Sequence, residues 1–388
     1  MKRNFIRASL GLLSLVIIAV LVADGFFKTS GSNENIATLA TAKTNVNRHS
    51  DVVVRPVSVA QKPATQEVKH TEVEDTPGSK YIAECDEQVD LAKAEKQFET
   101  AEIDKSIENL IPALDDSVYA ESQVALALIS GNESENTLVD KLKELRKKYP
   151  NNTMLSYDLL SLCTSPESSC KSSVIGEGIA LDSQNGAVLL LSAIYELNNN
   201  NIERATDFLL EASYAPVYEE YWGEHFSVFE SAFSQAGADS DLATKVASLK
   251  YSESAPLPNF GPLVRFCENT EETKHNILHA CLNMGQRMSN SESTMLTYLI
   301  GLSLQESVYK KSNDATQIAQ VSKMKEEFDM TLSLSEKATS LIWRNSQRTS
   351  DWQFQLKNSG ELAATEYIVE EAIRLSADVK FDPCESNW

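Results

Sequence analysis

The residues with the clearest chemical potential are two cysteines in the stretch LCTSPESSC, Cys163 and Cys170. A zinc site would need a second cysteine pair or nearby histidines, and a thiol redox site favours two cysteines closer together, as in Cys-x-x-Cys. Neither pattern is present, because the nearest other cysteines are Cys85 and Cys267. In an exported chain the pair is best interpreted as a structural disulfide, which would contribute about 2–3 kcal/mol by restricting the unfolded state.

The other four of the six cysteines fit the same interpretation. Cys267 and Cys281 are spaced as expected for a bridge from a loop to a helix. Cys85 and Cys384 then remain, and we pair them by elimination, since cysteine spacing alone does not fix connectivity. The prediction is therefore three disulfides: Cys163–Cys170, Cys267–Cys281 and Cys85–Cys384.

A second group of chemically capable residues lies in YAPVYEEYWGEHF, where three carboxylates are mixed with aromatic rings. Carboxylates among aromatic rings can perform acid–base chemistry on sugars when burial raises one pKa. The same residues can also form an ordinary repeat helix whose aromatic side chains pack inward. A third interpretation, which we favour over catalysis, is a peptide-binding hot spot with exposed aromatic residues in an acidic surround. Its residues are Tyr218, Tyr221, Trp222 and His225, beside Glu219, Glu220 and Glu224.

His275 and His279 are spaced to share one face of a helix, with Cys281 nearby. Two histidines at this spacing can bind a metal, but no obvious third ligand and no suitably placed glutamate accompany them. The sequence also has no glycine-rich phosphate loop and no serine-nucleophile elbow. We therefore predict no catalytic residue, no metal site and no cofactor.

The N-terminal sequence indicates the compartment of the protein. Lys2, Arg3 and Arg7 precede an apolar stretch from Leu10 to Ala23. Basic residues before an apolar segment hold that end in the cytoplasm, so the remainder is exported. The apolar region is close to the roughly 20 residues that span a bilayer core, although the sequence ADG ending at Gly25 also allows cleavage of a signal peptide. We predict an uncleaved signal anchor over residues 1–27 in a bacterial inner membrane, with the bulk of the chain in the periplasm.

Residues 28–80 are rich in Ser, Thr, Asn and Gln and lack helical periodicity, which predicts a disordered periplasmic linker. The full chain has a formal net charge of −21. A charge of this sign repels nucleic acid and anionic headgroups, and it favours a basic partner. We expect no nucleic-acid partner.

The elements that position these residues are helices. After residue 80, apolar residues recur at helical spacing and no convincing strand pattern appears. Turn residues Ser117, Pro150, Ser183 and Pro216 follow one another at a constant spacing of 33 residues. A fixed period of this length with two helices per unit is typical of a helical solenoid.

The repeat resembles the tetratricopeptide-repeat family, whose unit is a helix-turn-helix of nearly this length. The best match is NGAVLLLSAIYELNNNNIERATDFLLEASYAP, with the small residues Ala193, Ala205 and Ala212 at helix-packing positions and Pro216 at the terminal turn. The usual Gly-Tyr pair of the first helix is missing, since Ser192, Ala193 and Glu196 occupy that region. The resemblance implies an all-α, tetratricopeptide-repeat-like solenoid, which we assign to residues 81–250.

Residues 251–388 form a C-terminal helical region that begins with three prolines, Pro256, Pro258 and Pro262. The sequence predicts helices near 271–288, 292–310, 313–345 and 354–377, the second after a capping box at Ser289–Glu292. A hairpin of the last two helices would cap the open end of the solenoid, which otherwise exposes an apolar surface.

The predicted function is a non-catalytic, membrane-tethered scaffold that binds a protein or peptide in the bacterial envelope. The resemblance to anchored repeat proteins implies a role in envelope assembly, secretion or quality control. The alternative is an envelope enzyme or glycan-binding protein on a helical scaffold.

Overall fold

The computed structural model describes residues 82–83, 100–130, 135–238, 242–290, 293–342, 345–378 and 380–382. Within these ranges the chain is all-helical and contains no strand. The predicted anchor (1–27) and linker (28–80) lie outside the described residues. No described helix combines the length and apolar composition that crossing a membrane requires.

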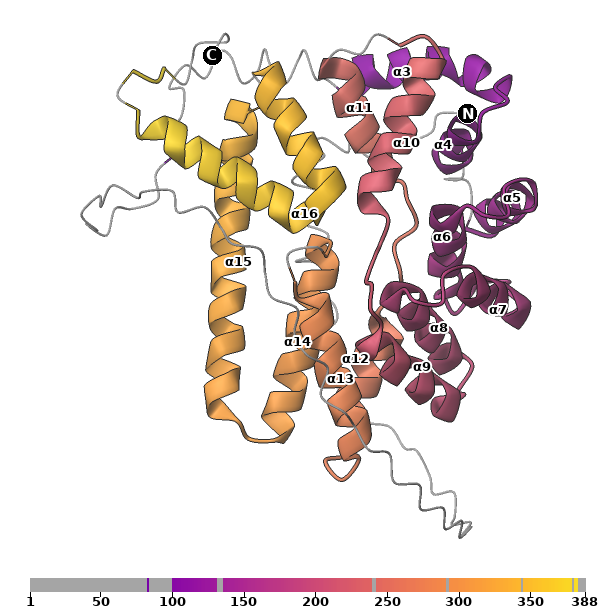
Figure 1. Cartoon of the computed structure of the whole chain (residues 1–388), viewed down its shortest axis with the longest axis vertical. Coiled ribbons are helices and arrows are strands. Elements are labelled where there is room, and N and C mark those ends of the chain that lie inside the picture. Colours follow the sequence, from indigo (N-terminus) through magenta and orange to yellow (C-terminus); the bar gives the residue numbers. More distant parts are fainter. Residues whose placement is uncertain are drawn as a thin grey trace, which may run out of the picture.

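The first part of the chain forms nine of the described helices, in this order: α3 (Thr100–Asp115), α4 (Ala120–Ser130), α5 (Glu135–Lys148), α6 (Thr153–Cys163), α7 (Ser172–Leu181), α8 (Gly186–Asn198), α9 (Ile202–Tyr214), α10 (Trp222–Gln235) and α11 (Leu242–Ser252). The second part forms the remaining described helices: α12 (Gly261–Asn269), α13 (His275–Met288), α14 (Met295–Lys311), α15 (Ala315–Ile342) and α16 (Ser346–Ser376). Figure 1 shows their arrangement.

The pairs α4–α5, α6–α7 and α8–α9 stack on one another as successive helix-turn-helix units (Figure 1). Asparagine caps begin two of the units, because Asn152 accepts a hydrogen bond from the Leu155 N–H and Asn185 accepts one from the Ala187 N–H. Such side chains satisfy backbone donors that the first turn of a helix leaves free. The result is a helical repeat-like fold, compatible with a tetratricopeptide-repeat-like solenoid.

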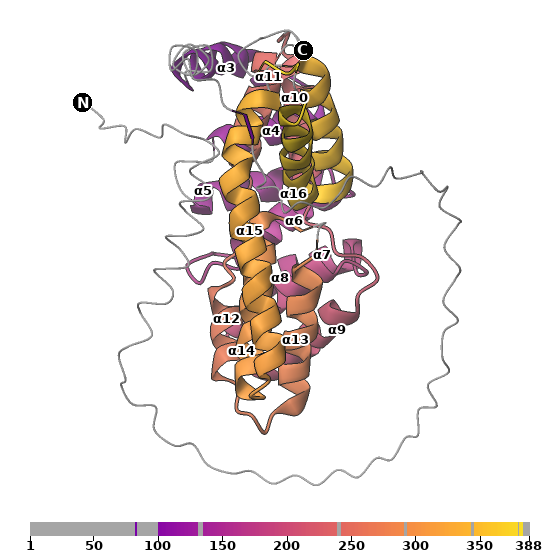
Figure 2. The same cartoon turned by 90° about the vertical axis from the view of Figure 1, so that its left-hand side faces the viewer.

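The predicted unit that follows Pro216 does not continue this stack. Helix α10, which follows Pro216, packs against α4, α3 and α16 at the opposite end of the molecule. Instead, α12 packs against α8 and α13 packs against α9, so residues 261–288 take the next place in the stack. Figure 2 shows α10 and α11 beside α3 and α4 at one end, and α12 and α13 beside α8 and α9 at the other. The constant 33-residue spacing was therefore misleading at Pro216, since sequence period does not report which helices pack together.

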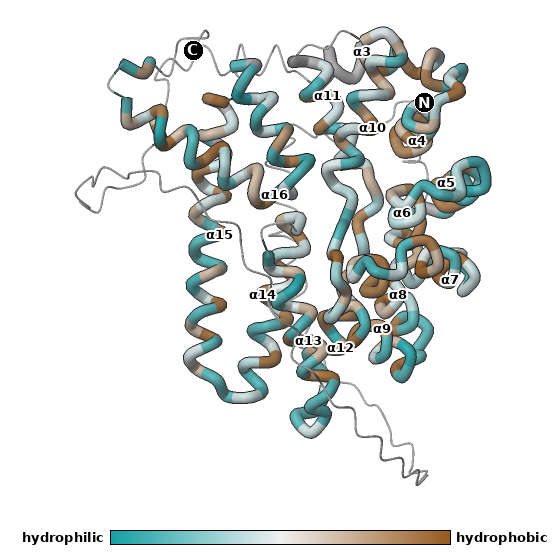
Figure 3. Tube along the Cα trace, in the orientation of Figure 1, coloured by the Kyte–Doolittle hydropathy of each residue, from teal (hydrophilic) through white to brown (hydrophobic). Residues whose placement is uncertain are grey.

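Two inner helices of the stack are buried on every side. Every residue of α6 from Met154 to Cys163 is buried, as is every residue of α8 from Gly186 to Ile194. Helices that are apolar all round are buried all round, which explains the weak amphipathic pattern of both segments. In Figure 3 the outer helix α5 is largely hydrophilic, whereas apolar segments gather near α4 and α8.

The C-terminal helices differ in detail from the sequence predictions. Helix α14 begins at Met295 and is capped by Thr294, whose Oγ1 accepts from the Thr297 N–H, so Ser289 is not its cap. Helix α16 begins eight residues earlier than predicted, at Ser346. It contains a break at Gly360, whose φ of 88° and ψ of 174° are not helical. The predicted hairpin of α15 and α16 is present, and its core extends to Phe226 and Leu249 of the α10–α11 pair.

Two of the three predicted disulfide pairs lie at bonding distance. Cys163 at the end of α6 is bonded to Cys170 just before α7, with their Cα atoms 5.4 Å apart. Cys267 of α12 is bonded to Cys281 of α13, with their Cα atoms 5.9 Å apart. Each bond fixes the two helices of one stacked pair relative to each other. Cys85 and Cys384 lie outside the described residues.

Candidate functional site

The region that collects buried polar groups is the junction where the segment between α9 and α10 crosses the stack. Val217 pairs with Asn185 in a parallel bridge, and its carbonyl accepts a 2.8 Å hydrogen bond from the Gly186 N–H. The Asn185 side chain then binds both backbone groups of Glu219, donating to its carbonyl (3.0 Å) and accepting from its N–H (2.9 Å). Asn185 is only 1% exposed, so these bonds form in a dry environment where they hold the segment firmly.

Tyr221 anchors the end of this segment. Its φ of 59° places it in the left-handed region, which is unfavourable for a residue with a side chain. Its hydroxyl donates to Asp182 Oδ2 at 2.6 Å, and its ring contacts that of Tyr157 at 5.6 Å between centroids. The exposed Glu219 carboxylate accepts the Tyr221 N–H at 2.8 Å. These contacts offset the backbone strain and point the tyrosine into the stack.

A buried ion pair joins α10 to α6. His225 Nε2 lies 2.8 Å from Asp158 Oδ1, and the two side chains are 3% and 0% exposed. Burial lowers the pKa of His225, but the Asp158 carboxylate, together with the Tyr221 backbone and Glu224, outweighs burial, so the pKa of the imidazole is raised above its ordinary value. The pair therefore favours a charged histidine in the folded protein.

Two carboxylates from distant parts of the chain converge on the N-terminus of α14. Glu220 accepts hydrogen bonds from the Thr294 N–H (2.9 Å) and from the Thr297 hydroxyl (2.5 Å). Glu361, the residue after the break in α16, accepts from the Met295 N–H at 2.9 Å. The positive end of a helix favours negative charge, but one helix end carries only about half an elementary charge. Burial raises the pKa of Glu220, against the opposing effect of its bonds to Thr294 and Thr297.

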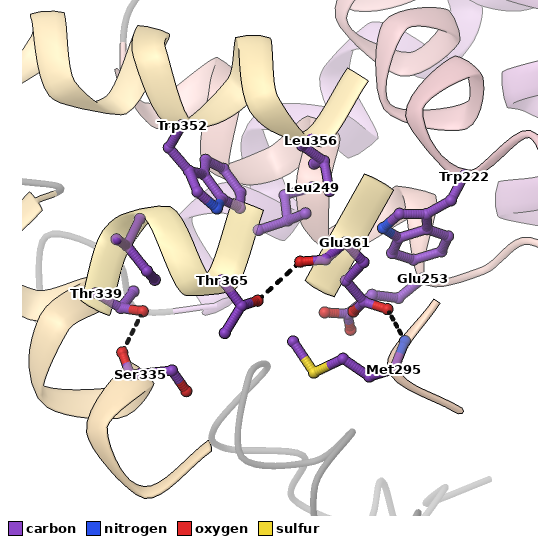
Figure 4. A pocket seen from close by; sticks show the side chains of 11 residues that line it. Trp222, Leu249, Glu253, Met295, Ser335, Thr339, Trp352, Leu356, Glu361 and Thr365 are labelled. Atoms are coloured by element: carbon purple, nitrogen blue, oxygen red, sulfur yellow. Dashed lines mark hydrogen bonds between the residues drawn. The ribbon is translucent and has the colours of Figure 1, made fainter. Parts of the chain in front are cut away.

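Glu361 also lines a small cavity with Glu253, which follows α11. Figure 4 shows both carboxyl groups near Met295, between the rings of Trp222 and Trp352. The pKa of Glu361 is raised to about 7, because burial and, to a smaller extent, the Glu220 charge outweigh the lowering effect of the Met295 N–H. Burial and then Glu361 raise the pKa of Glu253 to about 7, while Lys250 lowers it.

The volume of this cavity decides what chemistry it can support. A carboxyl group with a pKa near neutrality can transfer protons at physiological pH. The cavity has about 30 Å³ of free space, enough for about two water molecules, whereas ligand pockets generally exceed about 300 Å³. In this conformation the cavity accommodates proton exchange with water and excludes a ligand the size of a sugar ring.

The structure separates the predicted site residues. Tyr218, Tyr221 and His225 are buried in this structure. Tyr218 and Tyr221 precede α10 in the extended segment, whereas the sequence predicted all of these residues on one helix. Trp222 is half-buried against the C-terminal core, as the packing interpretation of the sequence expects. Partner binding by Tyr218, Tyr221, Trp222 and His225 stays a prediction.

The other candidates do not converge. Glu219 and Glu224 are exposed, whereas Glu220 is buried beneath α14. His275 and His279 are also exposed, and the described residues contain no cluster of three or more metal-ligating side chains.

Sequence analysis did not identify Asp158, Glu253 or Glu361. Asp158 had a detectable signal, since it is the single charged residue in the apolar helix TMLSYDLLSLC. Glu361 follows Gly360, and a glycine inside a helical pattern can mark a break. Glu253 has no comparable local signal, because its partners come from α14 and α16.

We compared the chain with known proteins. A scan against protein-family models, a search of curated proteins and a search of solved structures each found no match. The function proposed below is therefore inferred from the sequence and structure of this chain.

Proposed function

We propose that the protein is a non-catalytic scaffold of the bacterial cell envelope that binds protein or peptide partners through a tetratricopeptide-repeat-like body. The observation that best supports this proposal is the stack of helix pairs α4–α9, extended by α12–α13. Stacked helix pairs present an extended surface, and such surfaces are commonly used to bind other proteins. The acidic charge of the chain favours a basic partner and disfavours nucleic acid.

We further propose that residues 1–27 anchor the protein in the inner membrane and that residues 28–80 tether the body in the periplasm. The two described disulfides support an oxidising compartment, where such bonds form and persist. The basic residues before the apolar segment support a cytoplasmic N-terminus. Alkaline carbonate extraction of native membranes tests the anchor: we expect the chain in the membrane pellet, and a soluble chain beginning at Phe26 would contradict it.

The partner surface is proposed to lie outside the inner face of the stack, because the chain's own segment 215–221 crosses that face. Among the exposed large apolar side chains, Val118 and Tyr119 are neighbours in the chain and are 78% and 57% exposed. They precede α4 at the first end of the stack and remain exposed although α3 and α10 pack against α4. Adjacent exposed apolar residues are more typical of a contact site than isolated ones.

A photo-crosslinking amino acid placed at Tyr119 in the native cell tests this surface. We expect a discrete protein adduct, absent when the same amino acid replaces the exposed Glu203 of α9. The substitution Val118→Asp places a charge in the proposed apolar contact, so it should reduce the amount of adduct formed at position 119. Equal labelling at Tyr119 and Glu203, or no adduct at either, would argue against this surface.

A further inference from the structure

Helix α16 is two helical segments that meet at Gly360. The φ of 88° at this residue is a conformation that residues with side chains rarely adopt, so the break depends on glycine. Figure 1 shows the two segments at an angle to each other. Because no continuous helix spans the break, contacts on each side determine where the second segment, residues 361–376, lies.

The first segment is fixed tightly to α10. A Cβ atom added to Gly223 would lie 2.7 Å from Lys357 Cα, so the two backbones approach as closely as glycine allows. The second segment begins with Glu361, whose carboxylate accepts the Met295 N–H of α14. The hinge therefore separates a segment docked on α10 from one that packs against α15 in the C-terminal core and whose first side chain binds the N-terminus of α14.

The ionisable groups around Glu361 are mostly of one sign. Glu253 faces it from the end of α11 and Glu220 from the segment before α10, while the N-terminus of α14 supplies a partial positive charge. Lys250 lies near Glu253, and α15 contributes only the hydroxyls of Ser335 and Thr339 to the cavity. Like charges in a partly dry site repel strongly unless one of them is neutralised.

We propose that Glu253 and Glu361 form an acid latch, which holds the start of the second segment, at Glu361, against α14 and the end of α11 while the pair retains a proton and loosens it when both carboxyls ionise. A protonated carboxyl can donate a hydrogen bond to its neighbour, whereas two carboxylates can only repel. The Glu361 carboxyl can accept the Met295 N–H whether it is protonated or ionised, so that bond does not by itself favour either state. Repulsion between the two ionised carboxylates therefore decides the outcome. The cavity between Trp222 and Trp352 gives water the access that proton exchange requires.

The raised pKa values place the transition near neutral pH. Both groups have a pKa of about 7 in the folded protein, against 4.5 ordinarily. A carboxyl whose pKa is raised on folding favours the folded arrangement fully below its ordinary pKa, and this advantage is lost as pH rises to the folded value. The closed latch is therefore most favoured below pH 4.5 and loses this advantage by about pH 7, so it is more closed at pH 5.5 than at pH 8.5.

Hydrogen–deuterium exchange of the full chain in a mild detergent tests the latch. After correction for intrinsic exchange, peptides covering residues 294–298 and 361–376 should exchange at least about tenfold faster at pH 8.5 than at pH 5.5, since one unit of pKa shift corresponds to a tenfold change in the opening equilibrium. The double substitution Glu253→Gln/Glu361→Gln removes both charges and retains an acceptor for Met295. We expect it to give slow exchange in both peptides at both pH values.

Glu370→Gln is the matched control, since Glu370 is an exposed residue of the same segment of α16. It should keep the pH dependence of the wild type. Peptides from α6 and α8, which lie away from the hinge, should show no comparable change and so exclude global unfolding. Equal exchange of the wild type at both pH values, or an unchanged pH dependence in the double variant, would overturn the latch. This test does not involve a partner, so its failure leaves the scaffold proposal standing.

Discussion

The backbone N–H of Ala83 donates a 2.8 Å hydrogen bond to the Oγ of Ser376, 293 residues further along the chain. Beside it, Ile82 is 2% exposed and belongs to the same core cluster that Phe381 packs against. The first and last described residues of the body therefore meet on the second segment of α16.

This meeting bears on the third predicted disulfide. Cys85 follows Ala83 by two residues and Cys384 follows Phe381 by three, although both cysteines lie outside the described residues. We expect peptide mapping without reduction to recover a Cys85–Cys384 peptide. Replacing both by Ser should lower the free energy of unfolding by about 4 kcal/mol, since the loop is long. Free thiols at both positions in protein from its native compartment would show that the pairing by elimination is wrong.

A pair of glycine substitutions should have opposite effects on stability. A Cβ atom on Gly301 of α14 would lie 2.6 Å from the Gly285 carbonyl oxygen of α13, so Gly301→Ala should force the helices apart and cost about 1–3 kcal/mol. A Cβ atom on Gly176 of α7 meets nothing within 4 Å, so Gly176→Ala should stabilise by about 0.5–1 kcal/mol. Urea unfolding of both variants measures the two values. A neutral result for Gly301→Ala would show that α13 and α14 are not closely packed.

The His225–Asp158 pair should make stability depend on pH above about 6.5. Because the pKa of His225 is raised on folding, its contribution is complete below the ordinary value of 6.5 and is lost as pH rises through the folded value. At pH 6, Asp158→Asn should lower the free energy of unfolding by about 3 kcal/mol, because the buried charge of His225 loses its counter-ion. At pH 9 the loss should be smaller, because His225 is then neutral. Urea unfolding from pH 6 to 9 tests this, with Asp329→Asn on the exposed surface of α15 as control. A constant difference between wild type and Asp158→Asn at every pH would mean that His225 is neutral throughout.

Trp222 distinguishes packing from partner binding. The half-buried ring packs against the C-terminal core, so we expect Trp222→Ala to lower the free energy of unfolding by about 3 kcal/mol. Tyr214, which is 66% exposed, should tolerate the same change within about 0.5 kcal/mol. Thermal melting and crosslinking from position 119 should be measured together. Unchanged melting with loss of the partner adduct would restore Trp222 as a binding residue.

Local features determined much of what the sequence predicted. The absence of alternating strand patterns predicted a helical chain, because side-chain periodicity follows directly from backbone geometry. The short spacing of Cys163 and Cys170 limited their choice of partner, and the structure brings them together. The repeat units up to α9 were also predictable, since each helix packs on its neighbour in the chain.

The tertiary structure alone decided where α10 and α11 lie. The spacing to Pro216 and the composition after it continue the repeat. The helices α10 and α11 nevertheless pack beside α3 and α4, because contacts between segments distant in sequence determine their position. The same reason applies to the buried acids. The local sequence around Glu220, Glu253 and Glu361 does not indicate burial. Only packing against α14 buries Glu220, and only the meeting of α11, α14 and α16 partly buries Glu253 and Glu361 and raises their pKa values.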